Sequence, residues 1–189
     1  NQIFDNYARY TGLPVVVGML LYTLQLYAEF SGCMDIVRGS AQMFGIGLSE
    51  NFNQPFMSKT VSEFWRRWHI SLVSWFREYV YIPLGGNRVT VPRHLLNLLI
   101  VWFLTGLWHG ASWNFILWGL HFFVWLMLEK YLLRDFLQKL PSWLRHFYTL
   151  VVVFVGWGVF AMENLTVCAG YFETCFGSGT LWSAADGYY

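Results

Sequence analysis

Hydrophobic residues occur along this chain in long uncharged stretches separated by short polar segments. Residues 11–28 contain no charged side chain, and residues 95–128 form a second uncharged run of 34 residues. A helix needs about 20 apolar residues to cross roughly 30 Å of hydrocarbon. As one helix the second run would measure about 51 Å, at about 1.5 Å per residue, and would overshoot the bilayer. We therefore expect it to break into two helices.

The break in this run is predicted at residues 110–114, where Gly110 is followed by polar capping residues. Another uncharged stretch, residues 146–162, predicts a further span. We predict one membrane domain over residues 1–189, as the C-terminal part of a longer chain. Its predicted spans cover about 11–31, 94–111, 114–130 and 144–162. The predicted fold class is all-α: a polytopic membrane protein with short, broken and interfacial helices.

The segment between the first two spans has the period of an amphipathic helix over about residues 60–80. Apolar side chains and one histidine recur there at steps of three and four, at Trp65, Trp68, His69, Leu72, Trp75, Phe76 and Tyr79. Pro83 and the glycines at 85–86 are expected to end the helix in a turn. The pattern predicts that His69 lies on the inward, aromatic face of this helix.

The composition agrees with a membrane protein and argues against a nucleic-acid partner. Hydrophobic residues make up 56% of the chain and charged residues 12%, whereas soluble domains carry about 25% charged residues. The net charge of +1 provides no basic field for nucleic acid.

The basic residues indicate the orientation of the chain in the membrane. They gather in two loops, at Arg66, Arg67, Arg77, Arg88 and Arg93 and at Lys130, Arg134, Lys139 and Arg145, while residues 110–114 have none. By the positive-inside rule both basic loops face the cytoplasm, and the hairpin near His109 faces outward.

His109 is the most prominent candidate for chemistry because it lies in an uncharged span beside the predicted break. Ionisable groups inside a membrane are costly and are usually functional. A neutral imidazole can take a proton from a hydroxyl group and make it a nucleophile. The alternative is a histidine that hydrogen-bonds between helices as a packing group.

His69 is the second candidate, with a buried histidine bonded to a backbone carbonyl as its alternative interpretation. Neither histidine belongs to an HxxxH or HExxH pattern, so no metal site is predicted. Asp35 follows the first span and is either a polar group facing protein or an interfacial residue.

Four segments taken together resemble the membrane-bound O-acyltransferase family. They are "FSGCMDIVRGSAQMFGI", "ENFNQPF", "SEFWRRWHISLVSWFREYVYIPLGGNR" and "GLWHGASWNFILWGLHF", and the resemblance covers about residues 25–165. Within the family the sequence is most similar to the polysaccharide O-acetylase branch, which includes the bacterial alginate O-acetyltransferase membrane component.

The resemblance implies an O-acyltransferase in which His109 and His69 are the catalytic histidines. It implies a cytoplasmic acyl thioester donor such as acetyl-CoA, no bound cofactor, and a membrane tunnel. The implied acceptor is a polysaccharide hydroxyl, reached directly or through a secreted or periplasmic acetyltransferase partner. Multi-pass insertion in the bacterial cytoplasmic (inner) membrane, in contact with lipid, is also implied. Expected substrate-binding residues are Trp68, Arg66, Arg67, Arg88, Trp108, Asn114 and Asp35.

Three other functions stay open from the sequence. One is a D-alanyl-transfer-type acyltransferase. Another is an ion- or proton-coupled transporter fragment, in which Glu29 and Asp35 would form the ion path. The last is a structural membrane subunit in which both histidines are packing groups.

Overall fold

The structure is a computed structural model that describes residues 13–162 and 165–176. Its elements are α2 (Leu13–Met43), η2 (Pro55–Met57), α3 (Val61–Arg67), α4 (Ile70–Phe76), η3 (Arg77–Tyr81), α5 (Val91–His109), α6 (Trp113–Tyr131), α7 (Arg134–Lys139), α8 (Ser142–Ala161) and α9 (Leu165–Phe176). Within these ranges there is no strand, and the predicted all-α class is confirmed.

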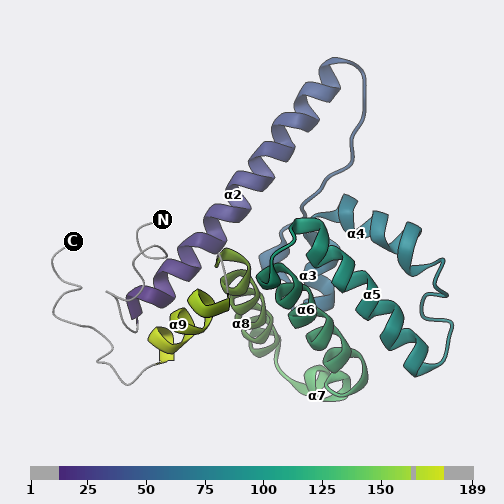
Figure 1. The fold of residues 1–189 in the computed structure, drawn as a ribbon. Coiled ribbons are helices and arrows are strands. Elements are labelled where there is room, and N and C mark those ends of the chain that lie inside the picture. The colour runs from purple at the N-terminus through teal and green to yellow at the C-terminus, as the bar shows by residue number, and fades with distance from the viewer. Residues whose placement is uncertain (1–12, 163–164, 177–189) are drawn as a thin grey trace, which may run out of the picture.

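Three of these helices, α2, α5 and α8, are long and apolar enough to cross a membrane. α6, predicted as a span over 114–130, has a similar length but is not one of the three. Asn114, His121, Glu129 and Lys130 lower its mean hydropathy. α6 nevertheless runs back along α5, as Figure 1 shows.

The turn between α5 and α6 lies at residues 110–112, inside the predicted interval. Gly110 has φ +156°, and a Cβ there would meet the Phe115 ring at 2.7 Å. Gly106 lets the two helices approach closely, because a Cβ on it would lie 2.5 Å from the Phe115 carbonyl oxygen. Glycines therefore determine both the reversal and the spacing of this helix pair.

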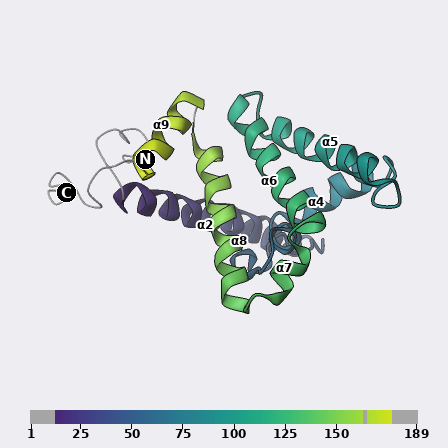
Figure 2. The ribbon, with the colours of Figure 1, turned by 90° about the horizontal axis from the view of Figure 1, so that it is seen from below.

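α2 extends well beyond the predicted end of the first span at residue 31. Its second half projects away from the bundle (Figure 1), so α2 passes behind α8 in the view from below (Figure 2), and Ile36 and Met43 are 72% and 80% exposed. The helix continues through Gly32 and Gly39 because no proline follows Pro14 before Pro55, and it ends before Gly45, which has φ +75°. The uncharged run therefore predicted a helix here but not where that helix ends.

The predicted helix over 60–80 is wrong as a single helix. α3 ends at Arg67, α4 begins at Ile70, and residues 77–81 form a π-helical turn. The break occurs because residues 51–53 hydrogen-bond to the backbone there: Asn53 N–H donates to the Arg67 carbonyl, and Ile70 N–H donates to the Asn51 carbonyl, both at 3.0 Å.

The aromatic stripe of this segment divides at the same break. Trp65 and Trp68 are buried, but Trp75 and Tyr79 are 51% and 66% exposed. The buried tryptophans join a core from α3, α5, α6 and α8, made of Val61, Phe64, Trp65, Trp68, Trp102, Trp118, Phe122, Val152, Val153 and Trp157. Trp68 of this core immediately precedes His69, so the core fixes the helix that leads to this histidine.

Candidate active site

His109 is the last residue of α5, immediately before the Gly110 turn. Its Nδ1 lies 2.8 Å from the carbonyl oxygen of Thr105, one turn earlier. A carbonyl oxygen can only accept, so Nδ1 carries the proton and Nε2 keeps its lone pair. The imidazole is therefore held in the tautomer in which Nε2 can act as a base.

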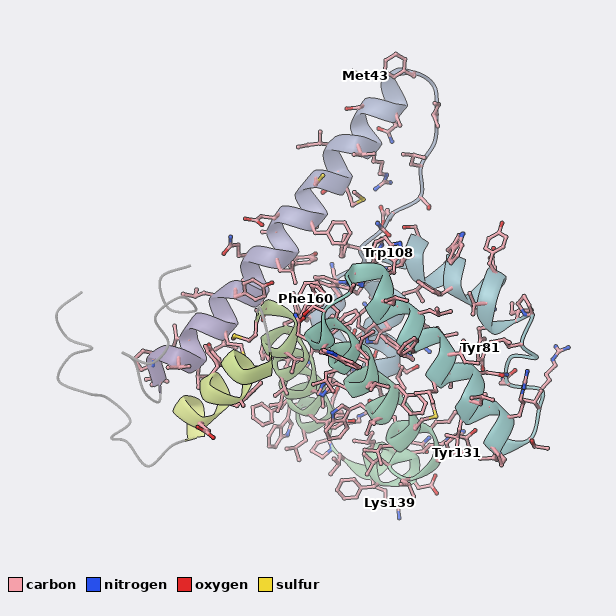
Figure 3. The ribbon with its side chains drawn as sticks, in the orientation of Figure 1. Met43, Tyr81, Trp108, Tyr131, Lys139 and Phe160 are labelled. Atoms are coloured by element: carbon pink, nitrogen blue, oxygen red, sulfur yellow. The ribbon has the colours of Figure 1, made fainter. Side chains whose placement is uncertain are left out.

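Aromatic rings surround the His109 imidazole. The ring centroids of Trp108 and Trp118 lie 4.8 Å from it, and that of Phe160 lies 5.3 Å away. In Figure 3, Trp108 and Phe160 lie towards the end of the bundle at which α5 turns into α6. This environment excludes much of the water that would compete for the imidazole.

His69 occupies the break between α3 and α4, with φ 45° and ψ 54°. This left-handed conformation costs a non-glycine residue about 1–2 kcal/mol, and such strain is concentrated at functional sites. The main-chain hydrogen bonds from residues 51–53 hold the backbone in it.

Asn51 also fixes the His69 ring. Its Oδ1 accepts hydrogen bonds from the backbone N–H and the hydroxyl of Ser71, both at 2.9 Å, and lies 3.4 Å from His69 Nδ1. Because this oxygen can only accept, Nδ1 of His69 is the protonated nitrogen and Nε2 keeps its lone pair. Both histidines thus have the same tautomer.

The two imidazoles share Trp108 as a neighbour, with ring centroids 6.1 Å from His69 and 4.8 Å from His109. Burial, and then the proximity of His109, lower the pKa of His69 to about 4. His69 is therefore neutral at physiological pH, as a proton acceptor or hydrogen-bonding group requires.

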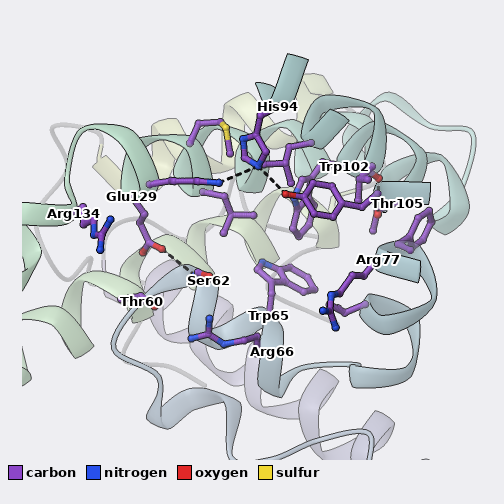
Figure 4. A pocket seen from close by; sticks show the side chains of 18 of the residues that line it. Thr60, Ser62, Trp65, Arg66, Arg77, His94, Trp102, Thr105, Glu129 and Arg134 are labelled. Atoms are coloured by element: carbon purple, nitrogen blue, oxygen red, sulfur yellow. Dashed lines mark hydrogen bonds between the residues drawn. The ribbon is translucent and has the colours of Figure 1, made fainter. Parts of the chain in front are cut away.

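A pocket of about 900 Å³ lies between α3, α4, α5 and α6 (Figure 4), and neither His69 nor His109 is among its lining residues. Trp65, Trp102 and Thr105 contribute to its wall, and Thr105 is the residue whose carbonyl holds His109. Cationic side chains also line it, from Arg66, Arg77, Lys130, Arg134 and Arg145. Within the described ranges none of these five forms a salt bridge with a carboxylate. The pocket can therefore hold an anion at one part and an apolar group at another.

The structure brings only some of the predicted substrate-binding residues to this pocket. Arg66 lines it, whereas Arg67 pairs with Glu63 at 2.7 Å and Arg88 is exposed outside its lining. Trp68 is only 3% exposed and belongs to the aromatic core.

The remaining predicted residues lie elsewhere. Trp108 is 59% exposed. Asn114 is buried and donates from Nδ2 to the Met162 carbonyl at 2.7 Å, which ties the start of α6 to the end of α8. Asp35 is exposed on α2 and lines a smaller pocket there. Among the described residues, no three histidine, cysteine or carboxylate side chains are placed so that they could hold a metal ion together.

Glu129 is a site residue that sequence reasoning missed. It is 8% exposed, and its two carboxylate oxygens accept the backbone N–H groups of Val61 and Ser62 at 2.6 and 3.0 Å. It therefore caps the helix that leads to His69, and it lines the large pocket. A carboxylate at the end of a predicted span was the only sequence signal for it.

His94 is the centre of a second missed cluster. Its Nδ1 lies 2.8 Å from the Tyr131 hydroxyl, and its Nε2 lies 2.8 Å from the Tyr81 hydroxyl and 3.1 Å from Lys130 Nζ. Asn97 donates to the carbonyls of Leu84 and Gly86. These contacts hold the glycine turn after η3 against α5 and shape one wall of the pocket.

The sequence of the chain is similar to known proteins of one family. Residues 5–170 match the membrane-bound O-acyltransferase family. The chain is 45% identical over 170 residues to the probable alginate O-acetylase AlgI of Azotobacter vinelandii, which covers 90% of this chain and 34% of that protein.

Two further relatives carry other names. A peptidoglycan O-acetyltransferase of Helicobacter pylori is 38% identical over 165 residues, covering 86% of this chain and 31% of that protein. A teichoic acid D-alanyltransferase of Bacillus subtilis is 34% identical over 119 residues, covering 56% and 30%. The chain thus spans about a third of the length of the curated relatives it matches.

Proposed function

The chain belongs to the membrane-bound O-acyltransferase family, and from this premise we propose that it supplies the catalytic histidines of a polysaccharide O-acetyltransferase. The proposed reaction moves an acetyl or other acyl group from a cytoplasmic thioester to a hydroxyl of a cell-surface or exported polysaccharide. The acceptor is reached directly or through a secreted or periplasmic acetyltransferase partner. The observation that carries the proposal is the pair of imidazoles that share Trp108 as a neighbour, each held with Nε2 unprotonated. Thr105, whose carbonyl holds His109, also lines a cationic pocket.

We assign the large pocket to the acyl donor. Arg66, Arg77 and the other cations without salt bridges suit the phosphates of acetyl-CoA, because guanidinium groups bind phosphate oxygens in pairs. The apolar wall suits the acyl chain and its thioester. Since Thr105 lies in this wall, the thioester can approach to within one helical turn of His109.

In the proposed mechanism His109 is the general base. Its Nε2 takes the proton of the acceptor hydroxyl while the oxygen attacks the thioester carbonyl carbon. A C–O bond forms, the C–S bond breaks, and the departing thiolate takes up the proton that the imidazole gained. His69, which also neighbours Trp108, provides a second neutral imidazole that hydrogen-bonds to a reacting group.

The proposed topology follows from the pocket and the charges. Basic residues from both loops line the same pocket, Arg66 and Arg77 from the first and Lys130, Arg134 and Arg145 from the second, which supports a single cytoplasmic side for the two loops. We place the protein in the bacterial inner membrane and treat residues 1–189 as one membrane domain, and we propose that α6 also crosses. The alginate-like branch is favoured over D-alanyl transfer because the AlgI match covers 90% of the chain and the D-alanyltransferase match 56%.

The proposal is tested by acetyl transfer from labelled acetyl-CoA, with the full-length protein in lipid nanodiscs and its native partners. We expect label on polysaccharide or on the partner, with one thiol released for each acetyl group moved. An ion current or proton flux without acetyl transfer would support the transporter interpretation instead. If both histidines are replaced and neither acetyl transfer nor ion flux changes, the chain is a structural subunit.

A further inference from the structure

His94 and the groups around it form a polar cluster in the large pocket, near the start of α5. His94 is only 2% exposed, and its Nδ1 lies 2.8 Å from the Tyr131 hydroxyl. Its Nε2 lies 2.8 Å from the Tyr81 hydroxyl and 3.1 Å from Lys130 Nζ, and these two contacts are the dashed lines at His94 in Figure 4. Tyr81, His94 and Lys130 all line the pocket.

The position of the proton on His94 follows from its neighbours. An ammonium group can only donate, so Nε2 of His94 keeps its lone pair and Nδ1 carries the proton. One lone pair on Nε2 faces two donor groups, the Tyr81 hydroxyl and the Lys130 ammonium, and the ammonium alone has three N–H bonds. The cluster therefore contains more hydrogen-bond donors than acceptors.

A surplus of donors that includes a cation is complementary to a phosphate group, whose oxygens accept charge-assisted hydrogen bonds. Among the described residues that line the pocket, Glu129 is the one carboxylate, and its oxygens accept the N–H groups of Val61 and Ser62. It is therefore committed to the α3 backbone rather than to Lys130. Arg134, the first residue of α7, lines the pocket as a further cation.

The length of the pocket along α5 matches a pantetheine arm. The α5 residues in the lining run from His94 to Thr105, which lie about three turns apart, or roughly 16 Å at about 1.5 Å per residue. A pantetheine arm has about 13 bonds from phosphorus to sulfur and spans about 15 Å when extended, at about 1.2 Å per bond. A thioester donor held by its phosphate at His94 would therefore place its sulfur near Thr105, whose carbonyl holds His109.

We propose that the His94 cluster binds the phosphate at the head of the pantetheine arm of the thioester donor. Lys130 and Tyr81 contact the phosphate, and His94 is a positioning residue that holds both groups through Nε2. The inference rests on the proposed function for the role of this phosphate in acyl transfer, but phosphate binding can be measured without any transfer.

The test is calorimetric titration of the full-length protein in nanodiscs with phosphopantetheine and with pantetheine, which differ only in the phosphate. Phosphopantetheine should bind at least about tenfold more tightly to the unaltered protein, the gain expected from a charge-assisted hydrogen bond. Lys130→Met and His94→Phe should each remove most of this advantage. Both variants should bind pantetheine as the unaltered protein does, which shows that the rest of the pocket is intact.

Two further variants separate positioning from packing. The side-chain oxygen of glutamine can accept from Lys130 and its amide can donate to Tyr131, so His94→Gln should retain the phosphate advantage to within about threefold. Lys139→Met is the matched control, because Lys139 is an exposed cation of α7 outside the pocket lining. It should leave both affinities unchanged.

Equal binding of the two probes by the unaltered protein would overturn the phosphate site, as would an advantage that survives both Lys130→Met and His94→Phe. A loss in His94→Gln as large as that in His94→Phe would overturn the positioning role of Nε2. If the advantage depends on Lys130 and His94 but no acyl transfer is found, the proposed function fails and the phosphate site stands.

Coenzyme A and the phosphopantetheinyl serine of a carrier protein both contain the phosphate and the arm. Titration with coenzyme A and with a phosphopantetheinyl-serine peptide distinguishes these two sources. A Lys130-dependent affinity for either one supports the phosphate site, and the tighter of the two identifies the donor.

Discussion

Glu129→Gln is the perturbation that most directly tests how the fold positions His69. The carboxylate accepts two backbone N–H groups, from Val61 and Ser62, at the first turn of α3. Glutamine has one acceptor oxygen, so its amide group would face one of these N–H donors. The substitution therefore removes a negative charge and leaves a buried donor without a partner.

The expected loss of stability follows from the burial of this contact. A hydrogen bond to a charged group contributes about 1.5–3 kcal/mol, and a charge at a helix N-terminus about 0.3–1 kcal/mol or more when buried. Glu129 is only 8% exposed, so solvent screens the interaction little. We expect Glu129→Gln to lower the unfolding free energy by about 2–3 kcal/mol.

The same change should slow transfer without weakening donor binding. A shift of α3 moves His69, and a misplacement of about 1 Å can cost about 100-fold in rate. Removing a negative charge from a pocket that contains five cationic side chains should not weaken binding of an anionic donor. We therefore expect kcat to fall about 10- to 100-fold, with the donor KM unchanged or lower.

The assay combines thermal unfolding of the full-length protein, followed by tryptophan fluorescence, with acetyl-transfer rates at varied acetyl-CoA. Glu78→Gln is the control, because Glu78 is exposed on η3. Unchanged stability and kcat in Glu129→Gln would refute the capping role. A raised donor KM with an intact kcat would instead make Glu129 a ligand-binding residue.

Three further predictions concern the donor pocket, the helix pair and pH. Arg66→Gln should raise the donor KM about tenfold through loss of a charge-assisted phosphate contact, whereas Arg88→Gln, outside the pocket lining, should not; equal effects in initial-rate assays would contradict the assignment. Gly106→Ala should destabilise the protein by about 1–3 kcal/mol, because its Cβ would lie 2.5 Å from a carbonyl oxygen of α6. Gly32→Ala, with nothing within 4 Å, should be neutral or stabilising in the same thermal unfolding assay. Burial, and then the neighbouring imidazole, lower the pKa of His69 to about 4. Between about pH 6.5 and 4 the unfolded chain therefore binds a proton at this histidine and the folded protein does not, so the free energy of unfolding should decline as the pH falls through this range. His69→Gln should flatten that part of the stability curve, and an unchanged curve would count against the buried neutral imidazole.

Local signals in the sequence were sufficient for the helix pair that carries His109. Gly110 and the polar residues after it act within one turn, so they mark the reversal without reference to the rest of the chain. The uncharged run also required a break, because its length exceeds the bilayer. The fold class and the position of His109 at the reversal were therefore predictable.

The break at His69 was not predictable because its cause lies elsewhere in the chain. The residues that hold it, Asn51 and Asn53, precede the segment and act through hydrogen bonds that no periodicity reveals. Glu129 similarly reaches Val61 across 68 positions. Sequence periodicity described a continuous helix, and long-range contacts converted it into two helices with a strained histidine between them.

The donor pocket was only partly predictable for a related reason. Arg66 was identified from its place in a basic segment. Arg67 and Arg88 belong to the same segment but lie outside the pocket. Arg134 and Arg145 enter the lining because α7 and α8 return the chain to this side of the bundle. Charge clustering predicts which loops share the cytoplasmic side, and the tertiary fold selects the side chains that meet in the pocket.

The most direct test of the central claim compares His109→Gln with His121→Gln in the full-length protein. Nδ1 of His109 donates to a backbone carbonyl and leaves Nε2 free, whereas Nε2 of His121 lies 3.0 Å from the Val152 carbonyl and serves as a packing donor. Glutamine can replace a donor in either place but cannot take up a proton. Acetyl transfer from labelled acetyl-CoA should fall about 10²- to 10⁴-fold in His109→Gln, with normal accumulation of the protein, and change little in His121→Gln. Transfer by His109→Gln at close to the parental rate would contradict the account, because His109 would then be a packing residue.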